Sequence, residues 1–389
     1  MDAVDRLRML SQQMSFEPAE DHCRVSGKPF TFDDTSTACG GDDIFVHPAV
    51  LPNGKRIKLL KTLLTSACER DCYYCPFRAG RDFRRATFKP EDFARLFLQL
   101  YNKGIAEGLF ISSGIAGGGP RTQDQLLATA EILRSKLGFR GYIHLKIMPG
   151  AQKAQVERAM QLADRVSVNL ESPNKQRLEK LAPRKDFFEE LMQPLRWIDH
   201  IRRTRPGYEG WNGRWPSSVT QFVAGGAGES DLELLATTQA LYRQLHLRRA
   251  YYSAFNPVPD TPLENQPAVS PRREHRLYQS SFLLRDYGFD LEEMPFDGEG
   301  NLPMDADPKL AWAKANLSEH PIEVNRAERR ELLRIPGIGP KLADAILAAR
   351  RQSCLSDVSS LRKLGVIVDR AAPFILLNGK RPAYQHSLF

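Results

Sequence analysis

Residues 63–78 read LLTSACERDCYYCPFR and overlap the end of an apolar stretch, 57–65, that predicts a β-strand. Three cysteines, Cys68, Cys72 and Cys75, fall within these residues at a spacing of C-x3-C-x2-C. Three thiolates at this spacing can hold one face of a [4Fe–4S] cluster and leave the fourth iron without a protein ligand. The loop that follows a strand lies on the catalytic face of an α/β barrel. The sequence therefore predicts a metal centre with an open position.

Two other interpretations of the three cysteines stay open at this stage. A structural zinc site usually has four protein ligands. Cys39, or one of His22 and Cys23, would have to supply the fourth. Alternatively, the three thiols are unrelated buried side chains. The sequence assigns no role to Cys23, Cys39 or Cys354.

Outward from this loop, short apolar strands alternate with amphipathic helices. The predicted strands are 57–65, 108–113, 142–147, 165–170, 218–223 and 249–255, and the predicted helices include 90–104, 125–138, 154–163 and 231–245. Six strand–helix units predict a parallel sheet with right-handed crossovers. A closed barrel would need eight units. The predicted fold class is therefore α/β, a partial (β/α)6 barrel.

Length and composition suit a globular protein of several parts. The chain has 389 residues, of which 42% are hydrophobic and 26% charged. We predict an N-terminal cap over 1–54, a barrel over 55–290, a linker with an acidic loop over 291–325 and a small all-α module over 326–389. The apolar runs are shorter than a membrane span, and the N-terminus lacks the pattern of a signal peptide. We expect a cytoplasmic protein without a membrane partner.

The C-terminal module is the basic part of the chain. Residues 326–389 contain 12 Lys and Arg against 5 Asp and Glu, which is +7 of the formal net charge of +8. The stretch LLRIPGIGPKLADAIL, 332–347, matches the helix-hairpin-helix pattern, in which backbone N–H groups at a helix start approach a phosphate. It predicts DNA contacts at Gly337, Ile338, Gly339 and Lys341.

The hairpin pattern is repeated 28 residues further on in the chain. LRKLGVIVDRA, 361–371, aligns with LRIPGIGPKLA, 333–343; it keeps Gly365 but has Ile367 where the first copy has Gly339. We expect the second copy to pack against the first more than to bind phosphate. The alternative is a helical hairpin that serves only packing or protein contact.

The cysteine motif, with the aromatic Tyr74 before its third cysteine, resembles the signature of the radical S-adenosylmethionine (SAM) superfamily. That resemblance implies a partial (β/α)6 barrel and a SAM molecule on the open iron of the [4Fe–4S] cluster, cleaved on reduction to a 5′-deoxyadenosyl radical. It also implies an electron donor such as flavodoxin or ferredoxin. The SAM-binding residues it implies are Tyr74, Ser113, Gly114, Asn169, Glu171 and Gly225. Here Ser112-Ser113-Gly114 replaces the Gly-Gly-Glu turn that is common in the superfamily.

The barrel and the hairpin module together resemble a narrower family, the DNA modification/repair radical SAM proteins. The stretches that carry this resemblance include KTLLTSACERDCYYCPFR, GYIHLKIMPGA, VSVNLESP and IEVNRAERRELLRIPGIGP. The resemblance implies a radical SAM enzyme that modifies or repairs nucleic acid, DNA rather than RNA, and a partner resembling uracil-DNA glycosylases. A radical SAM enzyme acting on RNA, peptide or a small molecule is one alternative. A non-catalytic Fe–S protein that binds DNA and senses redox state is another.

Overall fold

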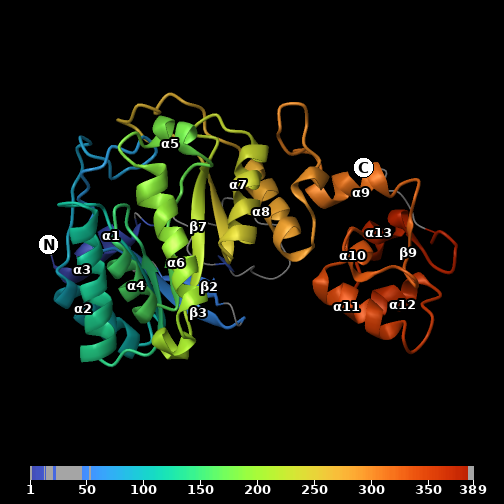
Figure 1. The fold of residues 1–389 in the computed structure, drawn as a ribbon, viewed down its shortest axis with the longest axis horizontal. Coiled ribbons are helices and arrows are strands. Elements are labelled where there is room, and N and C mark those ends of the chain that lie inside the picture. The colour runs from blue at the N-terminus through green and yellow to red at the C-terminus, as the bar shows by residue number, and fades with distance from the viewer. Residues whose placement is uncertain (1, 13, 15–20, 23–45, 52–53, 384–389) are drawn as a thin grey trace. The chain divides into compact units, whose positions relative to one another are not determined.

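The computed structural model describes residues 2–12, 14, 21–22, 46–51 and 54–383. The chain divides into two compact units, the first made of 1–229 and 240–271 and the second of 230–239 and 272–389 (Figure 1). Helix α7 (Asp231–Gln244) contributes residues to both units. We describe each unit by itself.

The first unit is built on one curled sheet with the strand order β1 to β8. Six neighbouring strands run parallel: β3 (Arg56–Leu63), β4 (Gly108–Ser112), β5 (Tyr142–Lys146), β6 (Arg165–Ser167), β7 (Ser217–Ala224) and β8 (Arg249–Ala254). They coincide with the six predicted strands. The predicted α/β half-barrel with six parallel strands is therefore confirmed.

Two further strands extend this sheet at its N-terminal edge. β2 (Val46–Val50) pairs antiparallel with β3, and the short β1 (Asp21–His22) pairs antiparallel with β2. The N-terminal cap predicted over 1–54 begins with helix α1 (Ala3–Gln12). The sequence did not predict β2, because its VHPAV stretch contains a proline, which a central strand would exclude. Residues 23–45 of the predicted cap lie outside the described residues.

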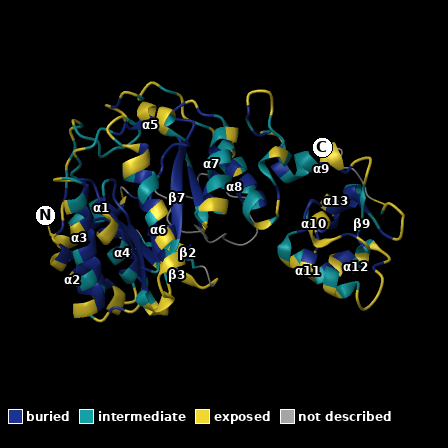
Figure 2. Cartoon of the chain, in the orientation of Figure 1, coloured by how far each residue is buried: buried dark blue, intermediate teal, exposed yellow. Residues whose placement is uncertain are grey.

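The sheet and its helices bury a continuous apolar layer. Register places Leu60, Leu109 and Ile143 side by side on β3, β4 and β5, and all three are almost fully buried. Helices α2 (Pro90–Asn102), α3 (Gly119–Glu131), α4 (Lys153–Leu162), α5 (Lys175–Leu181) and α6 (Gln193–Thr204) lie in the crossovers. In Figure 2 the sheet, seen at β7, is dark blue, and the helices carry exposed residues in yellow. Each parallel strand therefore ends at the same edge of the sheet, where the functional loops gather.

Some crossovers differ from the sequence prediction. The helix expected over 125–138 begins earlier, at Gly119, and ends in a π-helical turn, Ile132–Lys136. The crossover from β6 to β7 contains both α5 and α6, with a second π-helical turn, Phe187–Met192, between them. Between α6 and β7, residues 205–216 contain two short 3-10 turns, Gly207–Glu209 and Trp211–Gly213.

The second unit holds α8 (Pro271–Asp286, whose first residue falls in the first unit), α9 (Pro308–Asn316) and two helical hairpins near the C-terminus. The first hairpin joins α10 (Arg329–Leu332) to α11 (Pro340–Ala349), and the second joins α12 (Val358–Lys363) to α13 (Val368–Ala371). The short strands β9 (Ile322–Glu323) and β10 (Ile375–Leu376) pair in parallel beside them. One hydrophobic core, which includes Leu332, Ile338, Ile346, Leu361 and Val368, joins both hairpins.

No helix in the described part of the chain is long and apolar enough to cross a membrane.

Candidate active site

The loop with the three cysteines is fixed between the ends of β3 and β4. The Leu64 N–H donates to the Ser112 carbonyl at 2.8 Å, and the Gly114 N–H donates to the Thr65 carbonyl at 2.7 Å. A Cβ atom on Gly114 would lie 2.2 Å from the Ala67 carbonyl oxygen, so a side chain at this position would displace the loop. Gly114 therefore has a packing reason for being glycine, beside the cofactor contact predicted for it.

Arg85 ties the two ends of the same loop together. Its guanidinium donates to the carbonyl oxygens of Ser66 at 2.8 Å, Phe77 at 3.0 Å and Arg78 at 3.0 Å. It also lies 4.2 Å from the centroid of the Phe83 ring. These bonds span both sides of the cysteine motif and hold its backbone in one shape. The sequence analysis missed Arg85, because one arginine of an Arg-Arg pair carries no local signal.

The three thiols lie close to one another in a dry environment. Cys72 is buried, and Cys68 and Cys75 are half-buried. Burial raises the pKa of the Cys72 and Cys75 thiols, and the cysteines raise it further because their thiolates repel one another. Backbone N–H groups point at two of the sulfurs, from Ile115 to Cys68 Sγ and from Phe77 to Cys75 Sγ, each at 3.4 Å.

These features fit an iron–sulfur cluster. Thiolates with raised pKa values need a positive charge beside them, and the iron of a cluster supplies it. N–H groups that donate to the sulfurs are one of the means by which proteins tune such clusters. Within the described ranges, no three His, Cys, Asp or Glu side chains could hold a metal ion together. This finding concerns sites for a single metal ion. In a [4Fe–4S] cluster each thiolate binds a different iron, so the three sulfurs need not converge on one point.

The zinc alternative gains no support from the described residues. Cys39 and Cys23, which would have supplied its fourth ligand, lie outside the described ranges, as does the side chain of His22. Cys354 belongs to the second unit, where it is exposed and its thiol donates to Asn378 Oδ1 at 2.9 Å.

A buried charge pair lies against the cysteines. Lys185 Nζ is 3.1 Å from Glu171 Oε1 and 3.0 Å from the hydroxyl of Tyr74, and both charged side chains are less than 10% exposed, at 8% and 7%. Burial alone would lower the pKa of Lys185, but Cys72 and Glu171 raise it above its ordinary value. Burial and the Glu171 carboxylate raise the pKa of Tyr74. The structure thus brings two predicted cofactor residues, Tyr74 and Glu171, to the cysteines through Lys185.

Glu171 owes its position to an unusual backbone. It adopts a left-handed conformation with φ of 64°, which is uncommon for a residue other than glycine. Its N–H donates to the Gln221 carbonyl at 2.9 Å, and its own carbonyl accepts from the Val223 N–H at 2.8 Å. Strained residues of this kind concentrate at functional sites. Asn169, two residues earlier, donates to Gln221 Oε1 at 3.4 Å.

The glycine-rich loop after β7 is shaped by a buried carboxylate. Glu229 accepts from the N–H groups of Gly225 and Ala227, the latter at 3.1 Å. A Cβ atom on Gly226 would lie 2.8 Å from the Leu181 side chain, in an apolar cluster against which Tyr74 also packs. The predicted residue Gly225 therefore lies in a loop that Glu229 organises and that shares an apolar cluster with Tyr74.

A cavity of about 430 Å³ opens beside the cysteine loop. Its lining comes from the ends of β3 and β4 and from the start of α3, and includes Thr65, Ala67, Ser113 and Arg121. Ser113, predicted to bind SAM, donates to the Gly114 carbonyl at 2.7 Å. The carboxylate of Glu69, within the cysteine motif, accepts from Gly117 and Gly118 at 3.0 and 3.1 Å and so ties this loop to the turn before α3.

The predicted phosphate contacts lie in the second unit, in the turn before α11. Gly337 has φ of 84° and Gly365, its counterpart in the second hairpin, has φ of 92°. A Cβ atom on Gly337 would lie 2.8 Å from the Ile367 carbonyl oxygen, and one on Gly339 would lie 3.1 Å from the Tyr287 hydroxyl. Lys341 is exposed, whereas Ile338 is buried in the core that both hairpins share.

Comparison with known proteins identifies the first unit's active-site region. Residues 62–206 match the model of the radical SAM superfamily, and no curated protein matches the sequence. Solved structures with similar folds include HydG, a maturase of the [FeFe]-hydrogenase, at 12% identity and a TM-score of 0.45, with 58% of this chain and 49% of that chain covered. Methylornithine synthase (PylB) matches at 15% identity and a TM-score of 0.47, with 60% of this chain and 63% of that chain covered.

A third structure, the cobalamin-dependent SAM radical enzyme OxsB, matches at 12% identity and a TM-score of 0.36, with 78% of this chain and 46% of that chain covered. The chain therefore spans about half to under two thirds of the length of these structures. The superfamily match covers the cysteine loop, the buried pair of Glu171 and Lys185 and the strands between them. The match over residues 62–206 indicates a radical SAM enzyme.

Proposed function

We propose that the chain cleaves SAM at a [4Fe–4S] cluster held by Cys68, Cys72 and Cys75 and uses the resulting radical to modify or repair nucleic acid, DNA rather than RNA. The observation that carries the first half is the set of three mutually interacting thiols, one buried and two half-buried, inside the superfamily match. When bound, the cluster supplies the electron that starts SAM cleavage.

The protein's own residues hold and shield this site. Arg85 fixes the backbone on both sides of the cysteine motif, and Gly114 allows the loops after β3 and β4 to lie against each other. Tyr74 and Glu171 interact with the thiols, and together with Ser113, Gly114, Asn169 and Gly225 they remain the residues that we assign to SAM. Ser113 and Glu171 are buried, and burial excludes water, which protects a reactive species from side reactions.

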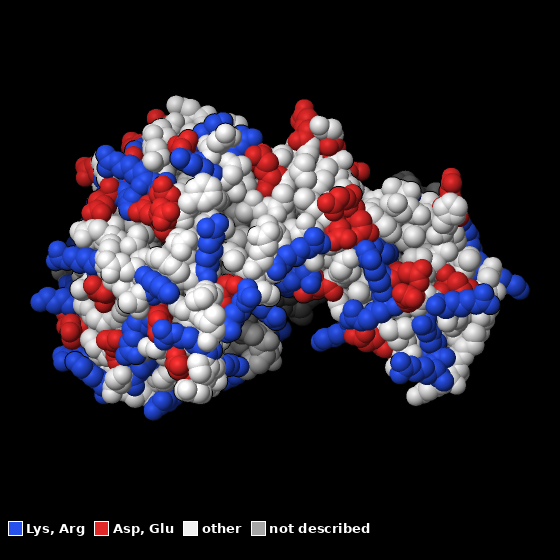
Figure 3. Space-filling view, viewed as in Figure 1, with Lys and Arg blue, Asp and Glu red and all other residues white. Residues whose placement is uncertain are grey.

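The nucleic-acid part of the proposal depends on the C-terminal hairpins. Both hairpins turn at a glycine with positive φ, and α11 presents its N-terminus directly after Gly339. Exposed basic side chains, Lys341, Arg351, Arg362 and Lys363, lie on α11, on α12 and after α11; Figure 3 shows Lys and Arg on the face of this part. Phosphate contacts of this type position a protein on nucleic acid without reading its sequence.

The test is anaerobic reconstitution of the chain with iron and sulfide, followed by incubation with SAM, a reductant and either duplex or single-stranded DNA. We expect 5′-deoxyadenosine to form and a mass change to appear in the DNA. Formation of 5′-deoxyadenosine without a change in DNA, but with one in RNA or peptide, would move the substrate to that class. Absence of 5′-deoxyadenosine under all conditions would leave a non-catalytic Fe–S protein.

A further inference from the structure

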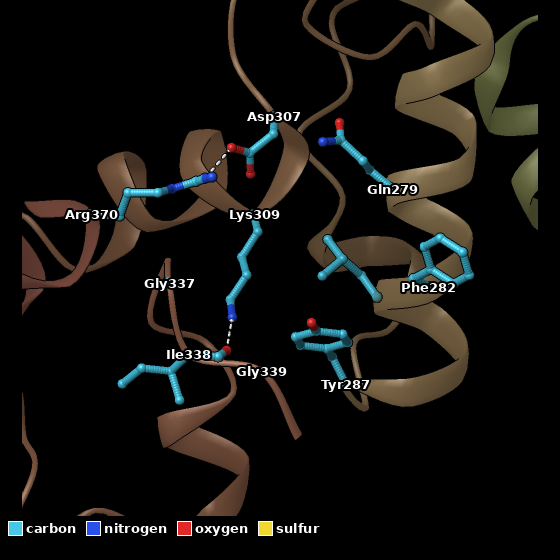
Figure 4. Close-up of a pocket in the computed structure, with 10 residues that line it drawn as sticks. Gln279, Phe282, Tyr287, Asp307, Lys309, Gly337, Ile338, Gly339 and Arg370 are labelled. Atoms are coloured by element: carbon cyan, nitrogen blue, oxygen red, sulfur yellow. Dashed lines mark hydrogen bonds and ion pairs between the residues drawn. The ribbon is translucent and has the colours of Figure 1, made fainter. Parts of the chain in front are cut away.

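Lys309 reaches the turn of the first hairpin from α9, outside the hairpins themselves. Its Nζ donates to the Ile338 carbonyl oxygen at 2.5 Å and lies 4.7 Å from the centroid of the Tyr287 ring (Figure 4). All three residues line a cavity of about 290 Å³ within the second unit, together with the ion pair of Asp307 and Arg370. The ammonium group of Lys309 is thus directed at the backbone of the turn.

The geometry of the peptide bond decides what this contact does. In a trans peptide, the carbonyl and the following N–H point in opposite directions. No peptide bond in the described part of the chain is cis. Because the Ile338 carbonyl points at Lys309, the N–H of Gly339 points away from Lys309, and that N–H has no hydrogen-bond acceptor among the described residues. It is left to bind a group outside the turn.

The Ile338–Gly339 peptide has a hydrogen bond on either side of it, from the Ile338 N–H to the Ile335 carbonyl at 3.2 Å and from the Ala343 N–H to the Gly339 carbonyl at 2.8 Å. Gly337 and Gly339 lack a Cβ atom, and glycine permits backbone rotations that other residues resist. Rotation of the Ile338–Gly339 peptide plane changes ψ of Ile338 and φ of Gly339. The Ile338 side chain is anchored in the core, but Gly339 has no side chain to oppose the rotation. The bond from Lys309 fixes the one carbonyl whose direction sets where the Gly339 N–H points.

We propose that Lys309 is a positioning residue of the phosphate site: it holds the Ile338 carbonyl so that the Gly339 N–H is directed at a phosphate group of nucleic acid, which Lys309 itself does not touch. The inference rests on the proposed function, because it takes the hairpin to bind phosphate. It adds a residue from α9, outside the hairpin motif.

The charge of Lys309 predicts a second measurable effect, a pH dependence of DNA binding. The pKa of Lys309 is lowered to about 7: burial is the largest cause, Arg370 and Arg334 act in the same direction, and Asp307 opposes them. The groups that face it are Asp307 on its own helix cap, Arg370 from α13, Arg334 after α10 and Tyr287 at the end of α8. Below pH 7 the charged form predominates and holds the carbonyl more strongly. The positioning effect therefore weakens as pH rises from 6 to 8.

The experiment measures binding of the full chain to a labelled DNA duplex by fluorescence anisotropy, across a salt series and at pH 6 and pH 8. Four variants are compared with the natural chain: Lys309→Met, Lys309→Arg, Lys341→Met and Lys314→Met. Lys314 is an exposed lysine on the same helix as Lys309 and serves as the matched control. The cavity beside Lys309 leaves room for the larger guanidinium of Lys309→Arg.

We expect Lys309→Met to weaken binding about fivefold at pH 6, the effect of one lost hydrogen bond. The slope of affinity against salt should stay unchanged, because every side chain that contacts a phosphate is still present. Lys341→Met should lower that slope by about 0.9, the value for one contact. Lys309→Arg should restore binding and remove the loss between pH 6 and pH 8, and Lys314→Met should bind as the natural chain does.

Three results would overturn the inference. Wild-type affinity of a folded Lys309→Met would do so, and so would a fall in its salt slope equal to that of Lys341→Met, which would make Lys309 a direct contact. If Lys309→Met does not fold, failure of a folded Lys309→Arg to bind would decide against it. The failure of the proposed function looks different: then neither Lys341→Met nor any Lys309 variant changes DNA binding.

Discussion

At the scale of single residues, the three cysteines of the first loop differ from the cysteine in the second unit. Replacing Cys68, Cys72 or Cys75 by Ala should abolish the absorbance of the [4Fe–4S] cluster and SAM cleavage, because three thiolates are the whole protein ligation that we assign. Cys354→Ala is the control, since Cys354 is exposed and bonded to Asn378. Iron content and visible absorbance after reconstitution provide the measurement. Retention of a full cluster in Cys72→Ala would argue against this ligand set.

Glu171 is assigned two roles, a hydrogen bond to SAM and an ion pair with Lys185, and a substitution can separate them. Glu171→Ala should weaken SAM binding by about 1–3 kcal/mol, the loss of a charge-assisted hydrogen bond, while the cluster stays. Titration of the reconstituted protein with SAM measures this. Glu179→Ala, an exposed carboxylate on α5, is the matched control. Unchanged SAM affinity in Glu171→Ala would leave Glu171 as the structural partner of Lys185 alone.

Lys185 should act on the cluster through its charge. It is buried, it interacts with Cys72 and Cys75, and a positive charge near the sulfurs favours the reduced cluster, which carries more negative charge. Lys185→Met should lower the reduction potential by on the order of 100 mV, the effect of one charge at this range in a partly polar interior. A redox titration followed by EPR measures it, with the exposed Lys180→Met as control. An unchanged potential would mean that Lys185 acts only on Glu171.

At the scale of elements, the sequence predicted the strands well and the contacts between loops poorly. Six parallel strands were predictable because each is an apolar run followed by a helical pattern. The spacing of the cysteines was informative for the same reason: it is local. Lys185 lies fourteen residues from Glu171 in the chain, and it meets the cysteines only because the loop after α5 folds over them. No local pattern encodes such a contact.

The sequence also could not show that two glycines assigned to ligand contacts are needed for packing. Gly114 and Gly339 were assigned to ligands because loops that approach ligands need glycine. The structure gives both a packing reason as well, the Ala67 carbonyl for Gly114 and the Tyr287 hydroxyl for Gly339. Replacing Gly337 and Gly339 by Val would therefore disturb the fold of the hairpins and could not isolate the effect on phosphate binding.

Arg85 holds a whole loop in place, because it donates hydrogen bonds to backbone carbonyls on both sides of the cysteine motif. Arg85→Gln should loosen the loop and speed the loss of iron to a chelator severalfold, while the secondary structure seen by circular dichroism stays. Arg84→Gln, the exposed neighbour, should lose iron at the natural rate. Equal rates in both variants would show that the loop holds its shape without Arg85.

At the scale of the whole molecule, the basic charge of residues 326–389 can be tested without cutting the chain. A cut before Arg326 would separate Arg334 from Glu293, Arg370 from Asp307 and Ile338 from Lys309, all pairs within the second unit. Weaker DNA binding after such a cut would thus mix misfolding with the removal of basic side chains. Substitution of exposed side chains avoids this difficulty.

Replacing Lys341, Arg351, Arg362 and Lys363 together by Gln should weaken DNA binding at low salt and reduce the slope of affinity against salt by up to about 0.9 for each phosphate that the variant no longer neutralises. The control replaces four exposed lysines of the first unit, Lys103, Lys136, Lys153 and Lys180, and so changes the net charge equally. Anisotropy titrations at several salt concentrations measure both. If general charge attraction alone binds DNA, the two variants weaken binding alike. If the control instead binds more weakly than the hairpin variant, nucleic acid binds to the first unit and the hairpins serve only packing.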